Sequence, residues 1–171
     1  MGDSKALIAC ALAAALALGC QAGRALTGHA QRMLRSPGEK LAALPERVAE
    51  QYDCERSPRP FFKLERNEVV PERVAAGAAI NHRFVYALCA ARPTDVVRGA
   101  LETRIVHEGG TVVRDRDPAY ALKPGRWIVD ATVEIPEAAR AGVYAIEVSF
   151  QSRAVRFREE RTFAVVGAKG R

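Results

Sequence analysis

The chain has 171 residues, of which 49% are apolar and 27% are charged, a balance that excludes an intrinsically disordered protein. The formal net charge of +6 first suggests a nucleic-acid partner. Arginine is nevertheless interleaved with acidic residues, as in residues 114–117 and 156–161, so no stretch concentrates the positive charge. We therefore expect one folded domain that binds no nucleic acid.

An apolar segment from Ala6 to Cys20 opens the chain, directly after Lys5. A membrane-spanning helix needs about 20 apolar residues, so this segment is too short to span comfortably. Its length and the small residues at its end are typical of the apolar core of a signal peptide. We therefore predict an exported protein.

The end of this segment, Leu16-Ala17-Leu18-Gly19-Cys20, resembles the lipobox of bacterial lipoproteins. The resemblance implies that residues 1–19 are a signal peptide, that Cys20 carries the lipid, and that acyl chains hold the protein on a membrane. With Gln21 rather than Asp after the cysteine, analogy with enteric bacteria predicts the outer membrane, facing the periplasm. An ordinary cleaved signal peptide and an uncleaved anchor are the alternatives.

Residues 20–53 are predicted to form a helical tether. Ser36-Pro37-Gly38-Glu39 has the pattern of a helix start, with a capping serine, a proline in the first turn and a glutamate three residues after the serine. An apolar stripe continues at helical spacing through Leu41, Leu44, Val48 and Tyr52. Pro45 is expected to kink or restart the helix. The segment is either a spacer, or a docking helix for a partner, or a helix packed on its own domain.

Cys54 and Cys89 remain as one pair if the signal peptide is removed and Cys20 is acylated. In an oxidising compartment such a pair predicts a disulfide, worth roughly 3–4 kcal/mol by chain entropy. The alternative is two free, buried thiols. No Cys-x-x-Cys spacing occurs and the three histidines are scattered, so we expect no metal site.

Residues 54–171 are predicted to form an antiparallel β-sandwich. Apolar residues alternate with polar ones in segments separated by turn residues, and Phe84, Tyr86 and Leu88 exemplify one face. Alternation of this kind is typical of antiparallel sheets with one solvated face. The predicted strands are 61–70, 79–90, 98–107, 111–114, 127–135, 142–150 and 155–165.

Three short motifs carry a second resemblance. They are Leu122-Lys123-Pro124-Gly125-Arg126-Trp127, Ile135-Pro136-Glu137 and Ala141-Gly142-Val143-Tyr144. These look like the closing strands of an immunoglobulin-like or macroglobulin-like domain, and the resemblance implies that fold without a function. A transthyretin-like sandwich is the alternative topology.

No constellation of catalytic residues is visible. His82 lies on an apolar strand face, which favours a structural histidine, and His107 next to a turn is interpreted as a surface residue. Phe61 and Phe62 must face opposite sides of a strand, so one of them is a candidate contact residue unless the preceding helix covers it. Trp127 is a further candidate contact residue, although a core position is favoured. We expect no enzyme activity and no cofactor.

These features favour a non-enzymatic accessory or assembly subunit that binds another cell-envelope protein through its sandwich. The alternative is a module that binds an envelope glycan or polymer through basic residues and one or two aromatic side chains. An enzyme is the third hypothesis, and it requires a pocket that gathers His82 or His107 with carboxylates.

Overall fold

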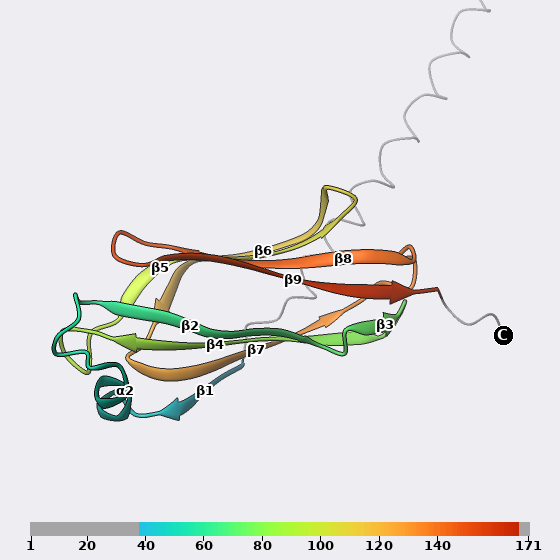
Figure 1. The fold of residues 1–171 in the computed structure, drawn as a ribbon. Helices are drawn as coiled ribbons and strands as arrows, with labels where there is room; N and C mark the ends of the chain where they lie inside the picture. The colour runs from blue at the N-terminus through green and yellow to red at the C-terminus, as the bar shows by residue number, and fades with distance from the viewer. Residues whose placement is uncertain (1–37, 168–171) are drawn as a thin grey trace, which may run out of the picture.

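The computed structural model describes residues 38–167 (Figure 1). The predicted signal peptide, the lipid-bearing Cys20 and the first part of the predicted tether lie outside these residues. Within the described part of the chain, no helix is long and apolar enough to cross a membrane.

The fold is mainly β, with two sheets packed against each other, as the alternating sequence pattern predicted (Figure 1). The first sheet has the order β1-β7-β4-β2, formed by Gly38–Ala43, Gly125–Glu134, Ala79–Cys89 and Phe61–Val70. The second has the order β3-β9-β8-β5-β6, formed by Arg73–Ala75, Arg156–Val166, Gly142–Gln151, Val97–His107 and Gly110–Leu122. All pairings are antiparallel except that of β3 with β9.

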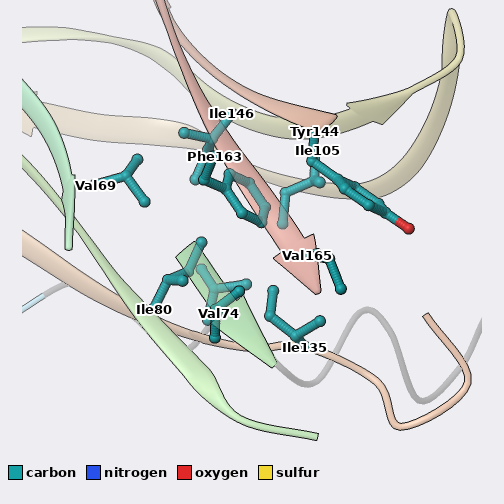
Figure 2. Close-up of a cluster of buried hydrophobic side chains, with 10 residues drawn as sticks. Val69, Val74, Ile80, Ile105, Ile135, Tyr144, Ile146, Phe163 and Val165 are labelled. Carbon is teal, nitrogen blue, oxygen red and sulfur yellow. The ribbon is translucent and has the colours of Figure 1, made fainter. Parts of the chain in front are cut away.

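Buried apolar side chains fill the space between the two sheets in two clusters. Figure 2 shows the first, in which Ile80 of β4 and Ile146 of β8 belong to opposite sheets. The second is rich in aromatic rings, and Phe62 of β2 stacks on Phe157 of β9 with ring centroids 5.1 Å apart. The inward face predicted for 79–90 is confirmed, since Phe84, Tyr86 and Leu88 are buried; the residues between them are buried as well.

A buried polar pair lies between these clusters along β4. His82, which follows Ile80 and precedes Phe84 on the inward face, has its Nε2 atom 2.8 Å from Oδ1 of Asn67 on β2. Arg161 of β9 donates from Nε to the backbone oxygen of Asn67 at 2.6 Å. This contact explains why an arginine interrupts the apolar face of β9: it joins β9 to the edge strand of the opposite sheet.

Helix α2, Pro45–Tyr52, covers the outer face of the first sheet with a small core of its own. Val48 is fully buried there against the Cys54–Cys89 disulfide, whose formation confirms the predicted bridge. Pro45 starts the helix in its first turn, as the restart alternative required. This helix is therefore one that packs on its own domain.

The helix predicted for residues 38–43 is wrong, because these residues form strand β1 on the edge of β7. Their alanine, leucine, lysine and glutamate favour helix in isolation, but pairing with β7 satisfies a row of backbone groups that an open sheet edge leaves unpaired. Residues 38–53 thus belong to the two-sheet structure.

Two further elements exceed the predictions. Strand β6 runs from Gly110 to Leu122, well past the predicted end at Arg114, and it includes Pro118. A proline is tolerated because β6 is an edge strand, and the β5–β6 register skips Pro118 at a bulge. Strand β3 has three residues, too few for an alternating pattern to be visible.

Candidate functional site

An apolar pocket of about 370 Å³ opens at the end of the strands opposite the disulfide, where Glu134 of β7 pairs with Ala79 at the start of β4. Its walls come from the ends of β5 and β7, the start of β6 and β8, and the loop between β7 and β8. The lining is mainly aliphatic, with a few polar side chains: Ile105, His107, Val112, Val113, Glu134, Ile135, Pro136, Ala138, Ala139, Arg140 and Tyr144.

A stacked pair of rings forms one wall of this pocket. His107 and Tyr144 are register partners on β5 and β8, and their rings lie nearly parallel with centroids 4.0 Å apart. The Tyr144 hydroxyl donates to the backbone oxygen of Arg140 at 3.0 Å, and Nδ1 of His107 lies 3.1 Å from the backbone oxygen of Val143. Both rings are therefore held in place before any ligand binds.

Gly142 allows this close packing. A Cβ atom at that position would lie 2.7 Å from Cε1 of His107, closer than packed atoms tolerate. Substitution at Gly142 therefore has to displace the histidine ring and reshape the pocket wall. The glycine in the Ala141–Tyr144 motif thus has a packing role beside the pocket.

The lining of the pocket is suited to binding an apolar group. Its lining, as far as the described residues form it, brings His107 together with Glu134 and Arg140, both of which are exposed, and contains no serine, threonine or cysteine to act as a nucleophile. Val112, 48% exposed, extends the apolar surface outward along edge strand β6. Within residues 38–167, no cluster of three or more metal-ligating side chains occurs.

The residues proposed from the sequence lie elsewhere. Phe61 packs against Tyr52 of α2, with ring centroids 5.2 Å apart, whereas Phe62 turns into the space between the sheets. The two rings thus face opposite sides of the strand, as predicted. The preceding helix covers Phe61, which was the alternative to a role as a contact residue. Trp127 is half-buried: its Nε1 donates to the backbone oxygen of Pro124, and Lys123 lies over the ring with Nζ 4.6 Å from the centroid.

The two histidines differ from their interpretation in one respect. His82 is buried and hydrogen-bonded, as a structural histidine should be. His107 is not simply a surface residue, because its side chain is only 12% exposed and forms part of the pocket wall. Sequence reasoning missed the pocket because its residues come from strand ends and one loop, which share no motif.

Comparisons with known proteins give no family for the chain. No family model matches it, and no curated protein matches it. Similar solved structures include the DNA glycosylase AlkC of Pseudomonas fluorescens bound to DNA (18% identity, TM-score 0.44, 61% of this chain and 30% of that one). A family 123 glycoside hydrolase of Clostridium perfringens is similar at 10% identity and a TM-score of 0.44, over 78% of this chain and 28% of that one. A β-glucosidase of Listeria innocua is similar at 10% identity and a TM-score of 0.43, over 63% of this chain and 16% of that one. The matched region spans less than a third of each of these chains.

Proposed function

We propose that this protein is a lipid-anchored accessory or assembly subunit of the bacterial cell envelope. In this proposal residues 1–19 are a signal peptide, Cys20 carries the lipid, and the anchor lies in the outer membrane, facing the periplasm. The two sheets are the layers of an immunoglobulin-like β-sandwich, which binds another envelope protein and catalyses no reaction.

The apolar pocket beside His107 and Tyr144 is the observation that supports a protein partner. Loop ends of β-domains commonly carry binding sites, and a concave, mostly apolar pocket with an exposed apolar rim suits an apolar side chain of a partner. The rim residue Val112 lies on an edge strand, which can also supply backbone hydrogen bonds to a partner.

Site-specific photo-crosslinking in the host of this protein tests the proposal. A photoreactive phenylalanine at Val112 should yield an adduct with one envelope protein. The same group at Leu44, which is 57% exposed and lines neither this pocket nor the cavity at the other end, should yield none. Absence of an adduct at Val112, or equal amounts of adduct at Val112 and at the control position, would contradict the proposed surface.

A variant that fills the pocket sharpens this test. Ala138 is exposed and lines the pocket, so Ala138→Trp should occupy the pocket without entering the core and should abolish the Val112 adduct. The control Ala119→Trp places the same side chain at an exposed position of β6 outside the pocket and should leave the adduct intact. Equal loss in both variants would count against the pocket.

A further inference from the structure

A second cavity, of about 500 Å³, lies at the other end of the molecule, near the disulfide. It is open to solvent, and four chain segments line it: the segment before β2, the β4–β5 loop, the start of β5 and the β8–β9 loop. The lining residues are Arg59, Pro60, Ala90, Ala91, Asp95, Val96, Val97, Arg98, Ser152, Arg153 and Ala154. The cavity shares no residue with the apolar pocket.

Positive charge dominates this cavity. Three arginines line it against a single acidic residue, Asp95. The charge of Asp95 is already matched by Arg92, which donates from Nε to both carboxylate oxygens at 2.9 and 3.2 Å. Among residues 38–167, neither Arg98 nor Arg153 forms an ion pair or a side-chain hydrogen bond. Two guanidinium groups are thus left to bind an anion.

The third arginine is held in position by the backbone. Arg59 donates from Nε to the oxygen of Cys54 and from Nη1 to the oxygen of Ala91, each at 3.2 Å. The first carbonyl belongs to Cys54 itself, and the second follows Cys89 by two residues, so the Cys54–Cys89 bridge ties together the two segments that hold Arg59. The remaining N–H groups of Arg59 can therefore bind an anion with little further loss of side-chain conformational entropy.

We propose that this cavity binds a phosphate group. Arginine is the side chain best suited to phosphate, because its planar fork of N–H donors matches the oxygens of that anion and stays charged at all relevant pH values. Three arginines from separate segments suit an anion with several oxygens better than a single carboxylate. The site is independent of the pocket proposed to bind a protein partner, and its ligand is either a lipid headgroup or a free phosphorylated molecule.

Calorimetric titration of the full chain with two probes tests the proposal. Pyrophosphate represents a free phosphorylated ligand, and a short-chain phosphatidylglycerol below its micelle concentration represents a headgroup. Saturable binding of at least one probe is expected, and the tighter probe identifies the source. The double variant Arg98→Gln/Arg153→Gln should weaken that binding at least tenfold.

A charge-matched control separates a built site from general attraction. Arg73 and Arg116 are exposed, form no ion pair among the described residues and lie outside the cavity, so Arg73→Gln/Arg116→Gln lowers the net charge equally. This control should retain the wild-type affinity. Equal weakening in both double variants, or no saturable binding of either probe, would overturn the proposal. Crosslinking at Val112 is unaffected by that result, so the two proposals fail separately.

Discussion

His82 is the buried residue whose protonation should limit stability in mild acid. Burial lowers its pKa from 6.5 to about 4, opposed in part by the charge of Asp130. In the unfolded chain the imidazole of His82 therefore takes up a proton near pH 6.5, whereas in the folded chain it stays neutral until near pH 4. The free energy of unfolding falls as the pH drops through this window. Between pH 7.5 and pH 5 we expect a loss of about 2 kcal/mol in the free energy of unfolding.

Urea unfolding at several pH values measures this loss, and His82→Gln is the matched variant because it keeps a polar group beside Asn67. The variant should be less stable at pH 7.5 but should lack the pH dependence above pH 5. Glu65, Asp130 and Glu147 have pKa values below their ordinary range, so their contributions are lost only at lower pH. A parallel decline in wild type and variant would refute the role of His82.

Gly125 is the residue at which β1, β7 and the β6–β7 connection meet. Its φ is +103°, and a Cβ atom would lie 2.7 Å from the backbone oxygen of Ala43. Gly109 also has a positive φ, of +77°, but a Cβ atom there would meet none of the described atoms within 4 Å, so Gly109 isolates the conformational cost. We expect Gly109→Ala to cost about 1 kcal/mol and Gly125→Ala at least ~1 kcal/mol more, measured by urea unfolding. Equal losses of stability in Gly109→Ala and Gly125→Ala would show that β1 moves aside for the added methyl group without a measurable cost.

Helix α2 is the element that depends most on a covalent bond. The Cys54–Cys89 bridge closes a loop across 35 residues of sequence, and Val48 packs directly against it. Replacing both cysteines by alanine should lower the free energy of unfolding by about 3–4 kcal/mol and should increase amide hydrogen exchange in α2 more than in β8. Reductant should reproduce the change in wild type and have no effect on the double variant. Unchanged exchange in α2 would mean that the apolar contacts and Arg126 hold the helix without the bridge.

Arg126 supplies the polar part of that attachment. It donates from Nε to Oε2 of Glu65 at 2.7 Å and from Nη2 to Oε1 of Gln51 at 2.6 Å. Tyr52 donates to Glu65 as well, and these hydrogen bonds, that of Arg126 first, lower the pKa of Glu65. A bulge in β2 between Leu64 and Arg66 contains Glu65, which leaves its ladder position and meets the helix.

Sequence reasoning succeeded for elements whose pattern follows burial directly. Strand 142–150 was predicted almost to the residue, because its alternate apolar residues face the core. Strand 61–70 has the predicted bounds because Pro71 ends it. Strand β1 was mistaken for helix because its stabilising partner, the edge of β7, lies far away in sequence. The second half of β6 was missed because the residues from Arg116 to Ala119 are exposed on both faces of the strand. Charged residues such as Arg116 and Asp117 therefore interrupt the alternation of apolar and polar residues. Neither cavity was foreseen, since each is assembled from segment ends that no motif connects.

The proposed lipid anchor concerns the whole molecule, and mass spectrometry tests it. Protein purified from membranes of its own host should have the mass of residues 20–171 plus acyl chains, because a lipobox cysteine becomes the acylated first residue. Reduction should add the mass of two hydrogens at the bridge. The variant Cys20→Ser should lose both processing and acylation. A mass for the full chain, or for a cleaved chain without lipid, would refute the lipoprotein proposal while leaving the two-sheet structure intact.

The pairing of β1 with β7 also determines how the domain responds to a pull from its N-terminal side. Gly38 lies beside Asp130, and Ala43 beside Arg126, so the strand is hydrogen-bonded along its length and is the first element to bear the load. Detachment of β1 and then of α2 would release only residues 38–53, because Cys54 is joined covalently to Cys89 at the end of the central strand β4. The bridge thus acts as a mechanical stop: once β1 and α2 have detached, tension at Cys54 passes through the bridge to β4, so the segment between Cys54 and Cys89 cannot be drawn out.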